Sequence, residues 1–139
     1  MFTGIVQATA LLATIEDRPG LRTFTIEFPD GFCRDLAIGA SVAVDGVCLT
    51  VTEIVSPTQA RFDVMQQSLA ITTLGGYVQG QRVNVERAAK EGAEIGGHPL
   101  AGQVDGVGTP IERRVPHNNL GGPLAGPPCS LSPRHRTRP

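Results

Sequence analysis

The chain has 139 residues, which is enough for one ordinary domain with a short extension. Its formal net charge is −1, from 12 basic and 13 acidic residues, so nothing indicates the clustered positive charge that nucleic-acid binding requires. Hydrophobic residues make up 40% of the chain, and there are no Trp, one Tyr and five Phe. The chain can therefore build a core, and that core must consist mainly of aliphatic side chains.

The three cysteines, Cys33, Cys48 and Cys129, are odd in number and include no Cys-x-x-Cys pair. Neither a disulfide framework nor a zinc site is indicated, and we expect no metal. No apolar run is long enough to span a membrane, and the N-terminus lacks the basic-then-apolar order of a signal peptide. These features predict a cytoplasmic protein with reduced thiols and no membrane partner.

Two strands are predicted near the N-terminus, each followed by a turn signal. Residues 4–14 form a β-rich apolar run that ends before the turn Asp17-Arg18-Pro19-Gly20. Residues 23–28 (TFTIEF) alternate between polar and apolar side chains, which is the period of a half-buried strand.

The middle of the chain predicts a hairpin and two further strands. Residues 41–44 and 47–55 flank Asp45-Gly46, a dipeptide typical of two-residue hairpin turns. Strands are also predicted over 61–65 and 82–86, with a short helix over 67–74 between them. Six short strands and one minor helix favour an all-β fold, a small closed Greek-key barrel, because closure removes exposed strand edges.

The character of the chain changes towards its C-terminus. Asp105-Gly106-Val107 repeats the pattern of Thr3-Gly4-Ile5, so residues 103–114 look like the opening strand of a second barrel. Six of the 11 prolines fall in the last 24 residues, which show neither helical nor strand period. We therefore expect a barrel over 1–98, a linker with a remnant strand over 99–114, and a disordered tail over 115–139 that reads as a truncated or out-of-frame end.

Cys48 and Thr50 are candidate binding residues. In a strand their side chains share one face, while Val47 and Leu49 point to the other. A thiol and a hydroxyl on one face could contact a polar heterocycle at the mouth of a barrel. The alternative is structural: a small core cysteine beside a β-favouring threonine.

The stretch from Phe62 to Ser68 runs from a predicted strand into polar residues. Backbone groups at a strand end could read the donor and acceptor edge of a polar ring, and Ser68 could bind a hydroxyl group of the same ligand. Alternatively, this is an ordinary strand end with Ser68 capping a short helix.

Four stretches carry a resemblance to a known family: residues 1–6 (MFTGIV), 39–51 (GASVAVDGVCLTV), 62–75 (FDVMQQSLAITTLG) and 83–98 (VNVERAAKEGAEIGGH). In order and spacing they resemble the N-terminal lumazine-binding barrel of riboflavin synthase. The resemblance covers roughly residues 1–113 and implies a transferase of riboflavin biosynthesis. Such an enzyme converts two molecules of 6,7-dimethyl-8-ribityllumazine into riboflavin and 5-amino-6-ribitylamino-pyrimidinedione, with neither a metal nor an organic cofactor.

The same resemblance implies a substrate site on short segments that are far apart in the sequence. Its residues would be Gly4, Ile5, Val6, Ser41, Cys48, Leu49, Thr50, Phe62, Asp63, Val64, Met65, Gln66, Gln67, Ser68, Gly102, Gln103 and Val104. The chain departs from the family pattern at two of them. Gln67 stands where the family usually has Glu, and Gln103 stands where it commonly has His, whose imidazole can exchange a proton near neutral pH. The catalytic residues are left unassigned.

The implied partners are small lumazine or flavin molecules, with a homotrimer for full-length enzymes of the family and a homodimer for this barrel alone. Because the family's reaction uses two barrels, a chain with one is expected to be weakly active or inactive by itself. A non-catalytic lumazine- or flavin-binding protein is the main alternative, and the two Gln replacements favour it. A nucleic-acid-binding barrel would need aromatic platforms and a basic groove, which 4% aromatic content and the charge balance argue against.

Overall fold

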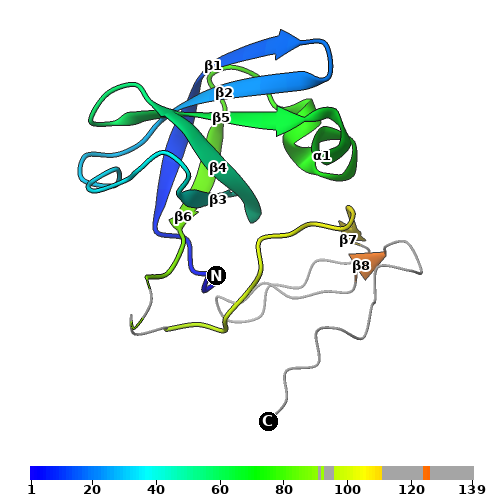
Figure 1. Cartoon of the computed structure of the whole chain (residues 1–139). Coiled ribbons are helices and arrows are strands. Elements are labelled where there is room, and N and C mark those ends of the chain that lie inside the picture. Colours follow the sequence, from blue (N-terminus) through cyan, green and yellow to red (C-terminus); the bar gives the residue numbers. More distant parts are fainter. Residues whose placement is uncertain (91, 93–95, 111–123, 126–139) are drawn as a thin grey trace. The chain divides into compact units, whose positions relative to one another are not determined.

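Six antiparallel strands form a closed barrel in the computed structural model, which describes residues 1–90, 92, 96–110 and 124–125. In chain order the strands are β1 (Ala8–Arg18), β2 (Leu21–Glu27), β3 (Ser41–Val44), β4 (Val47–Ile54), β5 (Gln59–Met65) and β6 (Arg82–Arg87). Around the barrel they follow the order β1-β2-β5-β4-β3-β6, and β6 also pairs with β1 to close the ring (Figure 1). The predicted fold class, an all-β six-stranded Greek-key barrel with one short helix, is confirmed.

The barrel interior is packed with aliphatic and phenylalanine side chains from alternate strand positions. On β2, Phe24 and Ile26 are fully buried, and on β5 the facing residue Phe62 is fully buried as well. The other large buried side chains are Leu12, Val42, Val44, Val51, Leu74 and Val85. The period of two divides the residues of β4 and β5 into an inner apolar set and an outer set. On β2, which was predicted to be half-buried, Thr23 and Thr25 are buried as well as Phe24 and Ile26.

The predicted hairpin joins β3 to β4 in the expected register. Val44 pairs with Val47, and the two turn residues Asp45 and Gly46 have φ values of 46° and 82°. Two positive φ values are what a type I′ turn requires, and Asp-Gly supplies them at low cost. The Asp45 carboxylate accepts hydrogen bonds from the Tyr77 hydroxyl and, at 2.7 Å, from the Asn84 backbone N–H, which ties the turn to the end of the barrel.

The helical segment differs in detail from its prediction. One short helix was expected over 67–74, whereas the structure has α1 (Gln66–Ile71) and a 3₁₀ helix, η1 (Thr73–Gly76). Thr72 separates them with an extended backbone, at φ −127° and ψ 172°. Its hydroxyl donates to the Ser68 carbonyl at 2.7 Å and accepts from the Leu74 N–H at 3.3 Å, so this side chain ends one helix and caps the next.

The first strand begins later than predicted. The apolar run indicated residues 4–14, but β1 spans Ala8–Arg18 and continues to the turn at Pro19-Gly20. Residues before Ala8 lie outside the ladder. Phe2 instead forms an isolated antiparallel bridge with Leu100, in a segment nearly a hundred positions away in the sequence. An apolar run therefore predicted extended backbone correctly, and tertiary contacts decided which part of it joins the barrel.

The chain divides into two compact units, Met1–Gln103 and Val104–Pro139. In the second unit, β7 (Thr109–Pro110) pairs with β8 (Leu124–Ala125) in a two-residue ladder. Of the tail expected to be disordered over 115–139, the structure describes only Leu124 and Ala125; the rest of that prediction lies outside the described residues. Among the residues that are described, no helix combines the length and the apolar character needed to cross a membrane.

Candidate functional site

One end of the barrel is covered by two segments that lie beside each other. Phe2 donates its N–H to the Leu100 carbonyl at 2.8 Å and accepts from the Leu100 N–H at 2.7 Å. The Phe2 side chain is buried, and Met1 accepts a hydrogen bond from the Ala89 N–H at 2.8 Å. These contacts fix the N-terminal segment, residues 1–6, against the returning segment, residues 96–103.

The returning segment reaches β4 at Cys48. The Cys48 N–H donates to the Gly102 carbonyl at 2.8 Å. A Cβ atom placed on Gly102 would lie 2.6 Å from the Cys48 Cβ and 3.0 Å from the Phe2 ring. Glycine is therefore required at residue 102, because any side chain would push the two segments apart. Gly102 and the adjacent Gln103, which is exposed, thus lie at the start of β4.

The N-terminal segment is also held by a residue that sequence reasoning did not select. Glu86 on β6 is buried, and its Oε1 accepts from the Thr3 N–H at 2.6 Å and the Thr3 hydroxyl at 2.7 Å. Its Oε2 accepts from the Gly4 N–H at 3.1 Å. Because the side chains of β6 alternate, residue 86 is expected to face the outside of the barrel, where an acidic side chain is ordinary. The sequence therefore contained no sign that Glu86 is buried and holds another segment.

The side chains of β4 alternate as predicted. Cys48 is half-buried and Thr50 is exposed on the outer face, whereas Leu49 is buried in the core with Val42 as its cross-strand partner. Cys48 therefore lies outside the barrel core, in contact with the returning segment at Gly102. Ser41, the partner of Thr50 in the β3–β4 ladder, is half-buried. The outer face of β4 offers a thiol and a hydroxyl, whereas the Leu49 side chain is part of the core.

The same division applies to β5. Phe62 and Val64 are core residues, while Asp63 and Met65 lie on the outer face, with Met65 62% exposed. The Asp63 carboxylate accepts a hydrogen bond from the Thr23 hydroxyl at 2.6 Å. The ladder between β4 and β5 runs from Val51↔Phe62 to Ile54↔Ala60. The segments 48–50 and 63–65 lie beyond its end. The Cys48 N–H is bonded there to the Gly102 carbonyl, whereas the backbone groups of Asp63 and Met65 have no pairing partner in β4.

Helix α1 follows directly from β5. Gln66 and Gln67 are exposed and Ser68 is half-buried. The residue that precedes the helix is Met65, which makes no side-chain capping hydrogen bond, so the alternative in which Ser68 caps the helix is wrong. Gln66 is the first residue of α1. Its N–H donates to the Gly20 carbonyl at 3.0 Å, which ties the start of the helix to the β1–β2 turn.

Two cavities lie near predicted site residues. Gly4 and Val6 line a small cavity of about 70 Å³ together with Gly46, Asn84 and Glu86. This is well below the ~300–1,000 Å³ that usually encloses an organic ligand. This cavity by itself is therefore too small to enclose a flat ring with a ribityl chain.

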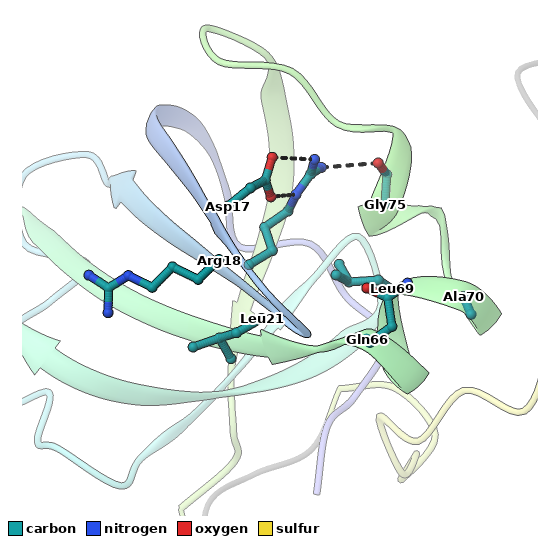
Figure 2. Close-up of a pocket in the computed structure, with 8 residues that line it drawn as sticks. Asp17, Arg18, Leu21, Gln66, Leu69, Ala70 and Gly75 are labelled. Atoms are coloured by element: carbon teal, nitrogen blue, oxygen red, sulfur yellow. Dashed lines mark hydrogen bonds and ion pairs between the residues drawn. The ribbon is translucent and has the colours of Figure 1, made fainter.

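The second cavity, of about 310 Å³, lies beside the β1–β2 turn and α1, and of the predicted residues it contains Gln66 (Figure 2). Arg22, one of the residues that line this cavity, already forms hydrogen bonds within the protein. The Arg22 guanidinium binds both oxygens of Asp17, at 2.6 and 3.0 Å, and the carbonyls of Leu74, Gly75 and Tyr77, at 3.0 to 3.3 Å. The neighbouring guanidinium lowers the pKa of the Asp17 carboxyl. Arg22 therefore anchors η1 to the barrel.

The structure thus brings together the predicted segments 4–6, 48–50 and 102–103 at one end of the barrel. Residues 63–68 lie on the adjoining strand and helix. Val104 belongs to the second compact unit and is not placed relative to them. Among the described residues, no group of three or more His, Cys, Asp or Glu side chains could hold a metal ion. Contact of the predicted residues with a ligand stays a prediction.

Comparison with known proteins identifies the family. The lumazine-binding domain family matches residues 3–88, which is most of the barrel. The chain belongs to this family. It is similar to riboflavin synthase from Escherichia coli strain K12, with 52% identity over 104 residues that cover 75% of this chain and 48% of the relative. The chain spans about half the length of the curated relatives it matches.

Solved structures lead to the same family. The crystal structure of LumP complexed with riboflavin matches 84% of this chain and 62% of LumP, with a TM-score of 0.72 and 29% identity. LumP complexed with 6,7-dimethyl-8-(1'-D-ribityl) lumazine matches with a TM-score of 0.69 and 28% identity, over 84% of this chain and 61% of LumP. The two LumP structures are complexes with riboflavin and with dimethyl-ribityllumazine, the two ligands that the sequence resemblance implied.

Proposed function

We propose that this lumazine-binding barrel binds the flat ring of 6,7-dimethyl-8-ribityllumazine or riboflavin on its open end. The observation that carries the proposal is the meeting of the segments 4–6, 48–50 and 102–103 in a chain of this family. Thr50 and Cys48 would face the ring, and the backbone of 63–65 would bind its uracil-like edge. Gln67 and Ser68, at the start of α1, would reach the ribityl hydroxyls.

The barrel would act as the N-terminal ligand-binding half of a riboflavin synthase. That reaction transfers a four-carbon unit from one dimethyl-ribityllumazine to a second, so both rings must be held in register. The family match covers one barrel, residues 3–88. This barrel would hold one of the two rings, and the second ring would be held by another lumazine-binding barrel.

A non-catalytic lumazine- or flavin-binding protein is a second candidate. It is favoured by Gln67 and Gln103, because neither amide can carry a proton as a carboxylate or imidazole does. The similarity to LumP in complex with riboflavin, which extends over 84% of this chain, also supports it.

Titration of the full chain with riboflavin tests the shared proposal, because stacking and hydrogen bonding at the site should quench the fluorescence of the flavin. Absence of quenching at any protein concentration would overturn it. Incubation with dimethyl-ribityllumazine then separates the two candidates. Appearance of riboflavin after addition of a C-terminal barrel supports the synthase half-site, whereas binding without turnover under that condition supports the non-catalytic protein.

A further inference from the structure

We propose that Glu86 is the positioning residue of the ligand site: its carboxylate holds the N-terminal segment in place, and through that segment the Gly102–Gln103 segment. This inference rests on the proposed function, because it assigns to Glu86 the assembly of two of the three segments that would contact the ring. Glu86 is buried, and it would act on the ligand through Thr3 and Gly4, because the cavity that it lines with Gly4 and Val6 holds only about 70 Å³.

The hydrogen bonds of Glu86 make the carboxylate and the N-terminal segment mutually dependent. Only 6% of Glu86 is exposed, and all three donors that reach it come from Thr3 and Gly4. Within the described residues no cationic side chain forms an ion pair with it. A buried carboxylate is costly unless its oxygens are hydrogen-bonded. The N-terminal segment therefore supplies the bonds that permit this burial, and the carboxylate in turn fixes the segment.

The influence of Glu86 extends to the returning segment. Phe2, next to Thr3, forms both backbone hydrogen bonds of the bridge to Leu100. A Cβ on Gly97 would collide with the Thr3 carbonyl oxygen, and a Cβ on Gly102 would lie 3.0 Å from the Phe2 ring. The path of residues 96–102 is thus shaped against residues 2–3. If Thr3 shifts, the adjacent Phe2 shifts with it, and Gly102 loses its packing contact with the Phe2 ring.

The side-chain role of Glu86 is separable from closure of the barrel. Its backbone pairs with Ala43 in the β3–β6 ladder, and the neighbouring Val85 is one of the large core residues. Replacing the carboxylate leaves that ladder and that core side chain in place. Its loss should therefore loosen residues 1–6 and 96–103 while the strands stay paired.

Glu86→Gln is the sharpest variant, because it keeps the size of the side chain but replaces one acceptor oxygen by an NH₂ group that cannot accept. At least one donor of Thr3 or Gly4 then loses its partner. Thr3→Val removes the hydroxyl's bond to Glu86 together with the bond that the hydroxyl accepts from the Ile5 N–H at 3.1 Å, and Thr3→Ser keeps both. Arg82→Gln, at an exposed position of the same strand, is the matched control.

Amide hydrogen exchange and riboflavin titration of the full chain test the inference. In Glu86→Gln we expect the amides of Thr3, Gly4, Leu100 and Cys48 to exchange at least about tenfold faster, with those of β2 and β5 unchanged. The dissociation constant for riboflavin should rise about tenfold, as for loss of a hydrogen bond to a charged group. Thr3→Ser should bind more tightly than Thr3→Val, and Arg82→Gln should match the parent protein.

The outcomes separate this inference from the proposed function. A parent protein that binds no riboflavin refutes the proposed function. A parent that binds, with a Glu86→Gln variant of equal affinity, refutes only the positioning role. Unchanged exchange at Thr3 and Gly4 in Glu86→Gln also refutes the positioning role, whatever the affinity. Uniformly faster exchange in every strand would show that Glu86 supports the barrel as a whole, and would likewise overturn it.

Discussion

The alternation of β4 predicts that stability and ligand binding can be disrupted separately by substitutions at neighbouring residues. Leu49 is 5% exposed and faces Val42 across the β3–β4 ladder, so Leu49→Ala should leave a cavity in the core. Such a substitution costs about 2–5 kcal/mol of unfolding free energy. For a domain whose total stability is of the order of 5–15 kcal/mol, the urea midpoint should fall by about 1–2 M.

Thr50 points to the opposite face of the same strand and is exposed. Thr50→Ala should change the unfolding free energy by no more than about 0.5 kcal/mol. If the hydroxyl binds the ligand, its loss should weaken riboflavin binding by about 2- to 12-fold, the equivalent of a hydrogen bond worth about 0.5–1.5 kcal/mol. Thr9→Ala, at an exposed threonine of β1, is the control and should alter neither quantity.

Urea unfolding followed by circular dichroism gives the stability, and quenching of riboflavin fluorescence gives the affinity. The reasoning would be refuted by a Leu49→Ala variant as stable as the parent, or by a Thr50→Ala variant that loses stability as Leu49→Ala does. A Thr50→Ala variant with full stability and full affinity would remove Thr50 from the proposed site while leaving the fold argument intact.

Four further predictions concern other parts of the barrel. Arg22→Met should lower the unfolding free energy by about 1–3 kcal/mol in urea melts, because three backbone carbonyls lose their donor; an unchanged melt would contradict the anchoring role. Burial and the bond to Asp45 raise the pKa of Tyr77 to about 12, so the neutral phenol is favoured by folding. The resulting stability should be complete below pH 10, decline as the pH rises towards 12, and be absent in Tyr77→Phe; a tyrosinate absorbance midpoint near 10 in the folded protein would contradict this. Burial raises the pKa of the Cys33 thiol, so iodoacetamide should label Cys33 more slowly than the half-buried Cys48, as mass spectrometry of peptides can show. Gly102→Ala should weaken riboflavin binding more than it lowers stability, because the added methyl would lie 2.6 Å from the Cys48 Cβ outside the barrel core.

Much of the barrel could be predicted from local patterns. Alternation over 23–28 and the Asp45-Gly46 turn indicated strands and a hairpin that the structure contains. The outward direction of Cys48 and Thr50 followed from the period of two in a strand. Helix ends were predicted less well, because the break at Thr72 depends on one hydroxyl that bonds to both neighbouring helices. The family followed from four motifs in the correct order, and the family match over residues 3–88 confirmed it.

The sequence by itself determined the strands, the tight turn and the inner and outer faces, because each depends on residues close together in the chain. Tertiary structure decided what happens where distant segments meet. Glu86 lies in a strand whose period would expose it, and it is buried because Thr3 and Gly4, more than 80 positions away, cover it and donate to its carboxylate. Gly102 is needed because the chain returns to Cys48 at close range. Neither contact has a local signal, since it arises only after the closed barrel has brought its first and last segments to the same end.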